Sequence, residues 1–340
     1  MTREPVGGTA FLAFPGMRGL LASELLGRFS YRVDGSSARW HGDLLCCPDF
    51  VPAADAGGQP AVPYWARTAL LSPERVRFES IGEAAAALRS VQRSWAPYQY
   101  QLFRRAALIQ EKLPHVHLKA RKFPCAVPNT PMGLYTLLDE KTMIAGARTT
   151  SPLPAGKIVF EEDHENPPSR AYLKLQESLT LFCTFFGAEL PKVGDKCFDA
   201  GACPGGWTHV LRLLGADVLA VDRSELSPRL MADSHVSFLA HDAFTLSPSD
   251  IESRLGRVDW LFSDVICYPS RLYDWISMWV ESKKARNIIC TIKMQGEADW
   301  SLIKKFGEIE NARIVHLNYN KHELTIMVRR EVARPHGNGQ

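Results

Sequence analysis

Four charged side chains lie within or beside apolar runs in the second half of the chain. Lys174 lies inside the helix-like segment SRAYLKL, and Lys293 closes the strongly apolar run NIICTIK. Asp264 follows the apolar run WLFS, and Glu323 opens the apolar segment ELTIMV. Since Lys and Glu are rarely buried unless they are paired, we expect two opposite-charge pairs at one end of a sheet. The alternative is that each is a separate surface or strand-end residue.

A glycine-rich loop, DAGACPGGW, lies between a strand-like and a helix-like run. Three glycines and one proline at such a junction indicate a backbone that approaches a ligand closely, with a plain strand-to-helix turn as the alternative. The glycine spacing fits neither G-x-G-x-x-G nor G-x-x-x-x-G-K-[ST], which disfavours a dinucleotide or a triphosphate. The candidate cofactor contacts in this loop are Asp199, Gly201, Ala202, Cys203, Pro204, Gly205, Gly206 and Trp207.

Acidic residues also end the next strand-like runs, namely Asp222 in LAVDR, Asp242 in LAHDAF and Asp264 in LFSDV. An acid that closes the second strand commonly accepts from the ribose hydroxyls of an adenosine. An acid that closes the third can accept from the adenine amino group. A nucleoside with an amino-acid tail in place of phosphates fits this set, and we therefore expect S-adenosylmethionine as the cofactor.

The elements that must position these residues alternate from Asp195 onward. Amphipathic helix-like segments such as SRLYDWISMWVESKK separate apolar strand-like runs such as DVLAVDR and VDWLFSDV. This alternation predicts an α/β fold with a doubly wound, mostly parallel sheet. The last two strand-like runs, ARIVHLNYN and ELTIMVRR, are joined only through Lys321 and His322. Because parallel neighbours need a long crossover, we predict an antiparallel hairpin there.

The N-terminal part of the chain has a different, α+β pattern. Helices are predicted in GMRGLLASELLGRF, IGEAAAALRSVQ and YQYQLFRRAALIQEKL, and strands in GTAFLAF, HVHLKARKF and TMIAGARTT. The proline-rich segment 150–169 is predicted to be a linker. We therefore expect an N-terminal region over residues 1–155, a second domain over 156–332 and a flexible tail over 333–340.

The composition is that of an ordinary globular protein. The chain has 340 residues, of which 46% are hydrophobic and 23% charged, and its net charge of +3 does not by itself indicate a nucleic-acid partner. The eight cysteines include no C-x-x-C pair, which argues against a zinc site and fits a reducing compartment. No apolar run reaches the ~18–20 residues of a membrane span, and no signal peptide is apparent. We expect a cytoplasmic protein with no metal and no membrane partner.

The segments FDAGACPGGWTHVL and PPSRAYLKLQES resemble the FtsJ-like RNA 2′-O-ribose methyltransferases, most closely the RlmM type, which methylates a cytidine ribose in large-subunit ribosomal RNA. The resemblance extends from about Pro167 to Arg330, although Tyr268 stands where the RlmM type usually has Lys. FPGMRGLLASEL resembles the start of that family's N-terminal RNA-recognition region, which is related to THUMP domains. The resemblance implies a Rossmann-like class I methyltransferase fold, S-adenosylmethionine as cofactor and RNA as partner.

The same resemblance implies that Lys174, Asp264, Lys293 and Glu323 form a catalytic tetrad. A ribose 2′-hydroxyl is a poor nucleophile until it loses its proton, and Lys293 is the candidate base. An ordinary Lys pKa is about 10.4. Burial and the charge of Lys174 would lower the pKa of Lys293, whereas Asp264 and Glu323 would raise it, and the sequence leaves the outcome open.

A ribose hydroxyl distinguishes RNA from DNA, and basic clusters could hold the RNA backbone. The N-terminal set interleaves Arg104, Arg105 and the run KARK at 119–122 with aromatic residues on which bases could stack. These aromatic residues are Tyr98, Tyr100, Phe103 and Phe123.

Three other functions remain as alternatives. A non-catalytic RNA-binding protein could retain the fold, but an intact tetrad argues against it. An RNA base methyltransferase would use a thiol, yet Cys203 lies in the cofactor loop and Cys290 in the middle of a strand. A nicotinamide-dependent oxidoreductase is disfavoured by the missing G-x-G-x-x-G motif.

Overall fold

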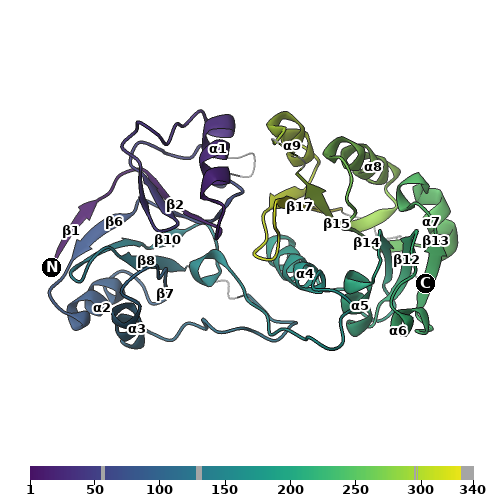
Figure 1. The fold of residues 1–340 in the computed structure, drawn as a ribbon, viewed down its shortest axis with the longest axis horizontal. Helices are drawn as coiled ribbons and strands as arrows, with labels where there is room; N and C mark the ends of the chain where they lie inside the picture. Colours follow the sequence, from purple (N-terminus) through teal and green to yellow (C-terminus); the bar gives the residue numbers. More distant parts are fainter. Residues whose placement is uncertain (55–57, 128–131, 295, 297, 331–340) are drawn as a thin grey trace, which may run out of the picture. The chain divides into compact units, whose positions relative to one another are not determined.

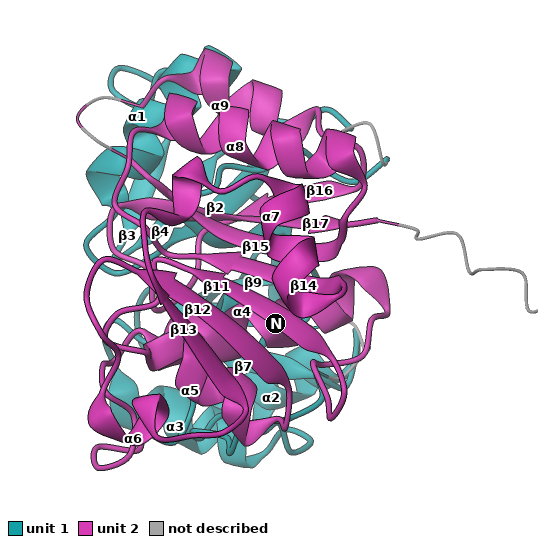
Figure 2. Cartoon of the chain, turned by 90° about the vertical axis from the view of Figure 1, so that its right-hand side faces the viewer, with its two compact units in different colours: residues 1–161 teal, residues 162–340 magenta. Residues whose placement is uncertain are grey.

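The chain forms two compact units, residues Met1–Glu161 and Glu162–Gln340, which are coloured separately in Figure 2. The computed structural model describes residues 1–54, 58–127, 132–294, 296 and 298–330. The first unit continues to Glu161, beyond the boundary expected after residue 155, because its last residues return to an earlier segment. The backbone N–H of Arg121 donates to the carbonyl of Val159, and that of Glu161 donates to the carbonyl of Arg121. The expected tail, 333–340, lies outside the described residues.

The first unit is built from two five-stranded sheets with the orders β1-β6-β9-β8-β7 and β10-β5-β2-β4-β3. Helices α2 and α3 pack on the first sheet, where Phe78, Trp95 and Tyr135 are among the buried residues. A second cluster, which includes Leu12, Leu70 and Ile144, fills the space between the two sheets. The elements are β1 (Thr2–Pro5), β2 (Thr9–Ala13), α1 (Arg18–Phe29), β3 (Arg39–His41), β4 (Leu44–Cys47), β5 (Ala66–Leu71), β6 (Glu74–Arg77), α2 (Ile81–Arg89), β7 (Trp95–Pro97), α3 (Phe103–Glu111), β8 (Gly133–Leu137), β9 (Thr142–Gly146), β10 (Arg148–Thr149) and η1 (Pro154–Gly156).

The predicted strand over HVHLKARKF is wrong. Within residues 115–123, only Arg121 forms a bridge, with Phe160. The segment is polar, and the side chain of Leu118 is exposed, so it offers no apolar face that a sheet could bury. It instead follows the surface of the unit as a loop.

The second unit contains a seven-stranded sheet with the order β13-β12-β11-β14-β15-β17-β16. The first five strands in this order, β13, β12, β11, β14 and β15, pair in parallel, each with the next. Strand β17 pairs antiparallel with both β15 and β16. This confirms the predicted doubly wound, mostly parallel sheet with an antiparallel end. The strands are β11 (Lys196–Ala200), β12 (Asp217–Asp222), β13 (Val236–Ala240), β14 (Val258–Ser263), β15 (Ala285–Lys293), β16 (Ala312–Val315) and β17 (Glu323–Arg329).

Helices cover both faces of this sheet (Figure 1). The helices α4 and α5 lie on one face with α6, and α7, α8 and α9 lie on the other. Every residue of β14 is buried, as expected for a central parallel strand covered on both sides. The helices are α4 (Tyr172–Phe186), α5 (Gly206–Leu213), α6 (Pro228–Met231), η2 (Ala243–Thr245), α7 (Pro248–Leu255), α8 (Pro269–Ser282) and α9 (Trp300–Gly307). No helix in the described residues is long and apolar enough to cross a membrane.

The connection between β16 and β17 is longer than the sequence predicts. It runs from residue 316 to 322, because β16 ends at Val315 instead of continuing through NYN. The backbone N–H groups of Asn318 and Tyr319 donate to the buried carboxyl group of Glu177 on α4, at 2.9 and 3.1 Å, instead of to a neighbouring strand. Burial raises the pKa of Glu177 to about 8.

Candidate active site

Four elements bring four charged side chains to one end of the seven-stranded sheet. Lys174 lies in the first turn of α4, and Asp264 follows the last residue of β14. Lys293 is the last residue of β15 and is directly opposite Glu323, the first residue of β17, in the antiparallel ladder. The register between β15 and β17 therefore fixes the pairing of the last two residues.

The four side chains form a closed ring of ion pairs. The Nζ atom of Lys174 lies 2.9 Å from a carboxylate oxygen of Asp264 and 2.6 Å from one of Glu323. The Nζ atom of Lys293 lies 2.6 Å from Asp264 and 2.7 Å from Glu323. Their side chains are only 9–18% exposed, so the charges compensate one another with little help from water. Two cations and two anions give the ring no net charge.

The ion pairs within the ring also shift the pKa values of Lys293 and Asp264. Burial lowers the pKa of Lys293, but the charge of Asp264 and the hydrogen bonds to Asp264 and Glu323 outweigh it, so that the pKa lies above the ordinary value. Burial raises the pKa of Asp264, but the charges of Lys174 and Lys293 outweigh it and hold that pKa below its usual range. Lys293 is therefore an ammonium group at neutral pH in this arrangement.

The glycine-rich loop follows β11 and leads into α5, beside the ring. Gly201 and Gly205 have φ of 80° and 110°, which other residues rarely adopt. A Cβ atom at Gly201 would meet the side chain of Val265, the residue after Asp264, and one at Gly205 would meet Leu230. The glycines thus allow the loop to pack against the segment after β14 and against α6, which explains their presence without a ligand contact.

The acids at the strand ends already accept hydrogen bonds. Asp222 accepts from the backbone N–H groups of Cys203 and Ser224, both at 3.0 Å. Asp242 accepts from the guanidinium groups of Arg223 and Arg271 at 2.7 and 3.2 Å, and from a backbone N–H at 3.0 Å. These two arginines were not among the predicted site residues, and no motif identifies them. A carboxylate has about four acceptor positions, so both acids retain acceptor capacity.

Asp199, predicted as a cofactor contact, is completely buried beneath the loop. It accepts a 2.6 Å hydrogen bond from the hydroxyl of Thr208 on α5, and burial raises its pKa to about 7. Trp207 donates its indole N–H to the carbonyl of Ala171 just before α4. Both residues therefore hold the loop in place, and Thr208 joins them although the sequence did not single it out.

The loop and the strand-end acids fit an adenosyl cofactor with an amino-acid tail. The carboxylate of Asp222 lies at the end of β12, where it could accept from ribose hydroxyls. Among the described residues, no side chain caps the N-terminus of α5, so its first backbone N–H groups could receive the carboxylate of the tail. Asp242 could take the base, and Asp264 lies between this place and Lys293. No group of His, Cys, Asp and Glu side chains that could bind a metal occurs in the described residues.

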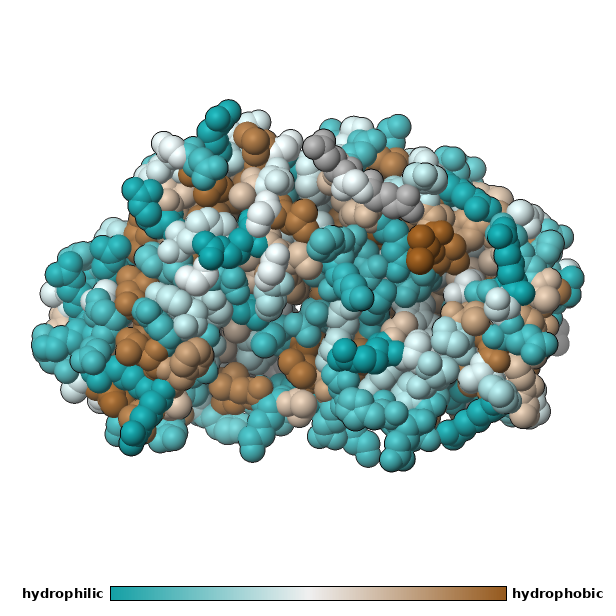
Figure 3. Space-filling model, viewed as in Figure 1, coloured by the Kyte–Doolittle hydropathy of each residue, from teal (hydrophilic) through white to brown (hydrophobic). Residues whose placement is uncertain are grey.

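Two apolar side chains beside the ring are unusually exposed. Ile266 is 80% and Tyr268 is 68% exposed, and both lie between Asp264 and the start of α8. The face of the molecule in Figure 3 carries such hydrophobic residues as small patches within a mainly hydrophilic surface. An exposed aromatic ring next to a charged site can stack on a nucleobase.

Comparisons with known proteins agree with this arrangement. Residues 167–318 match the FtsJ-like methyltransferase family. Proteins called "Ribosomal RNA large subunit methyltransferase M" are 31% identical over 201 residues in Halorhodospira halophila, 28% over 229 residues in Pseudoalteromonas atlantica and 30% over 210 residues in Alkalilimnicola ehrlichii. These alignments cover 58–61% of this chain and 56–61% of the relatives. The chain thus spans somewhat more than half the length of these relatives.

Proposed function

We propose that this protein transfers a methyl group from S-adenosylmethionine to a ribose 2′-hydroxyl of RNA, because residues 167–318 match the FtsJ-like methyltransferase family. Large-subunit ribosomal RNA is the proposed substrate, because the similar proteins from three bacteria carry that name. The observation that supports the chemistry best is the ring of Lys174, Asp264, Lys293 and Glu323 beside the glycine-rich loop.

The residues of the ring have distinct roles in this proposal. Asp264 and Glu323 hold the amine of Lys293 at the carboxyl end of β15, and Lys174 contacts both of these carboxylates. The bound cofactor would supply an electrophilic methyl group on a sulfonium. The 2′-oxygen forms a bond to that methyl carbon as the carbon–sulfur bond breaks, and Lys293 takes the hydroxyl proton. Because the ring holds Lys293 as an ammonium, it must first lose a proton to solvent before it can act as the base.

A cytoplasmic location and an N-terminal RNA-recognition region belong to the same proposal. The first unit has its own fold and core, and its basic and aromatic residues are suited to backbone contacts and stacking. Tyr98 and Tyr100 lie with their ring centroids 5.8 Å apart and nearly parallel, and Tyr98 is buried. Tyr100, which is only partly buried, is therefore the better candidate of the two for stacking on a base.

The proposal is tested by incubating the purified chain with radiolabelled S-adenosylmethionine and with ribosomal RNA from cells that lack the gene. We expect label in the RNA, and mapping should place it on a ribose 2′-oxygen of the large-subunit RNA. Label on a base would favour base methylation instead. RNA binding without any label would favour the non-catalytic alternative.

A further inference from the structure

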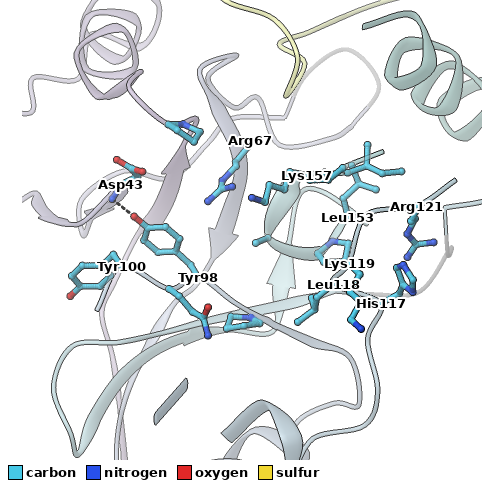
Figure 4. Close-up of a pocket in the computed structure, with 17 residues that line it drawn as sticks. Asp43, Arg67, Tyr98, Tyr100, His117, Leu118, Lys119, Arg121, Leu153 and Lys157 are labelled. Atoms are coloured by element: carbon cyan, nitrogen blue, oxygen red, sulfur yellow. Dashed lines mark hydrogen bonds between the residues drawn. The ribbon is translucent and has the colours of Figure 1, made fainter. Parts of the chain in front are cut away.

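The first unit contains a cavity of about 530 Å³ that the methyl-transfer chemistry does not use (Figure 4). Residues from β5, from the segment after β7, from the loop 117–121 and from η1 line it. Its basic residues are Arg67, Lys119, Arg121 and Lys157, and its one acidic residue is Asp43. The cavity is therefore strongly cationic although the whole chain has a net charge of only +3.

Arg67 is placed in the cavity by an irregularity of the sheet. Leu12 pairs with Thr68 but Ala13 pairs with Ala66, so Arg67 is the extra residue of a bulge in β5. Bulges change the direction in which a side chain points, and they are frequent beside functional sites. The side chain of Arg67 is only 9% exposed, and its guanidinium lies 5.6 Å from the ring centre of Tyr98.

The guanidinium of Arg67 lacks the partners that buried cations normally have. Its Nε atom is buried without a hydrogen-bond partner, and no ion pair to Arg67 occurs in the part of the chain that the structure describes. Desolvation lowers the pKa of Arg67, and Tyr98 and Asp43 partly offset that effect. The nearby carboxylate of Asp43 thus favours the charged form without pairing with it.

A second cation points toward the same space. Figure 4 shows the amine of Lys157 directed at the guanidinium of Arg67 across the cavity. Lys157 follows Gly156, whose φ is 72° and where a Cβ atom would overlap the carbonyl oxygen of Arg67. The glycine therefore lets η1 pack directly on β5. Partial desolvation and the charge of Arg67 both lower the pKa of Lys157.

We propose that Arg67 and Lys157 bind a phosphate group of an RNA strand in this cavity. Two cations that face each other repel, and an anion between them would compensate both charges. A guanidinium can contact a phosphate through two parallel N–H groups, and an ammonium adds a point charge. This inference rests on the proposed function for its ligand, because RNA is the phosphate-bearing substrate of that proposal.

The test measures binding of a short fluorescein-labelled single-stranded RNA to the full chain at several salt concentrations. Arg67→Gln should weaken binding about tenfold and should reduce the slope of log K against log salt by ~0.7, the value for one lost phosphate contact. Lys157→Gln, at a more exposed position, should have a similar but smaller effect. Arg77→Gln is the charge-matched control, because Arg77 is exposed on β6 and does not line the cavity.

Two results would overturn the inference. One is that both cavity variants, folded as judged by circular dichroism, bind RNA as tightly as Arg77→Gln does. The other is that inorganic phosphate, at concentrations that saturate the wild-type protein, fails to compete with RNA. Equal affinity for RNA with and without a 5′-phosphate would identify an internal phosphate as the ligand, and a preference for the phosphorylated end would identify a terminal one.

The failure of this inference differs from the failure of the proposed function. If the cavity variants bind and methylate RNA normally, the inference fails and the function stands. If the wild-type protein binds RNA through Arg67 but incorporates no label, the function fails and the cavity assignment stands.

Discussion

Two sites, one in each unit, handle buried positive charge in opposite ways. In the second unit, Lys174 and Lys293 each contact both Asp264 and Glu323, and the ring has no net charge. In the first unit, Arg67 is as deeply buried, but it makes no ion pair within the described residues.

This difference separates two uses of a basic side chain. A lysine inside a neutral ring has a fixed position, which suits it to chemistry on a group that is brought to it. An unpaired cation in a cavity attracts an anion, because binding restores the interactions lost on burial. The following predictions test whether the ring serves the chemical step and the cavity serves anion binding.

The largest effect is expected for Lys293→Ala. Removal of the proposed base should lower kcat by on the order of 10³-fold, within the range for general-base catalysis. RNA affinity and the affinity for S-adenosylhomocysteine, measured by calorimetry, should change less than about threefold. Lys305→Ala, an exposed position on α9, is the control. Turnover close to wild type in Lys293→Ala would refute the role of Lys293.

The next effect concerns pH. Lys293 must be neutral to accept a proton, and its pKa lies above the ordinary value. Below that pKa the neutral fraction rises about tenfold per pH unit, so log kcat should increase with a slope near one from pH 7 to about 9.5. Single-turnover rates at saturating RNA would measure this. A plateau near pH 8 would mean that another group, or a Lys293 whose pKa falls when substrate binds, is the base.

A smaller effect should follow from placing a second carboxylate in the cavity of the first unit, beside that of Asp43. Gln99 lines the cavity and is exposed, so that its replacement should preserve the fold. Gln99→Glu should weaken RNA binding about threefold to tenfold at low salt, and Gln99→Lys should strengthen it. Fluorescence anisotropy with both variants would check the sign. Equal affinities would contradict a role for the cavity in RNA binding.

The smallest effect is expected for the response of the chemical step to salt. The paired, largely buried ring is poorly screened by ions, so kcat at saturating RNA should change less than about twofold between 50 and 200 mM KCl. RNA affinity should fall steeply over the same range. Single-turnover rates and binding isotherms in the same buffers would separate the two. A parallel fall in kcat would indicate that the ring is not sealed from solvent.

Much of the second unit could be predicted from its sequence. Apolar runs of strand length, separated by amphipathic helices, predict the doubly wound sheet, and the antiparallel end of that sheet is confirmed. The residues that end strands follow from the same pattern. The length of the connection between β16 and β17 could not be predicted in this way, because the backbone N–H groups of Asn318 and Tyr319 donate to Glu177, which is distant in the sequence.

The first unit was less predictable. Its helices α2 and α3 lie within the predicted segments, but the strand over 115–123 is absent. Alternating polarity there resembles a strand, yet no apolar face is available for burial. No sequence pattern identifies Arg67, because it is a single Arg in the strand ARTALL and because no local motif predicts the bulge there.

By itself, the sequence determined which residue types stand at the ends of the strands, since those follow from the local alternation of apolar and polar residues. Only the tertiary structure decided which of the charged side chains are paired and how their pKa values shift. Burial and ion pairing have opposite effects on the pKa of a lysine, and their balance depends on distances between residues that lie far apart along the chain. That balance leaves Lys293 paired and protonated, and leaves Arg67 buried without an ion-pair partner among the described residues.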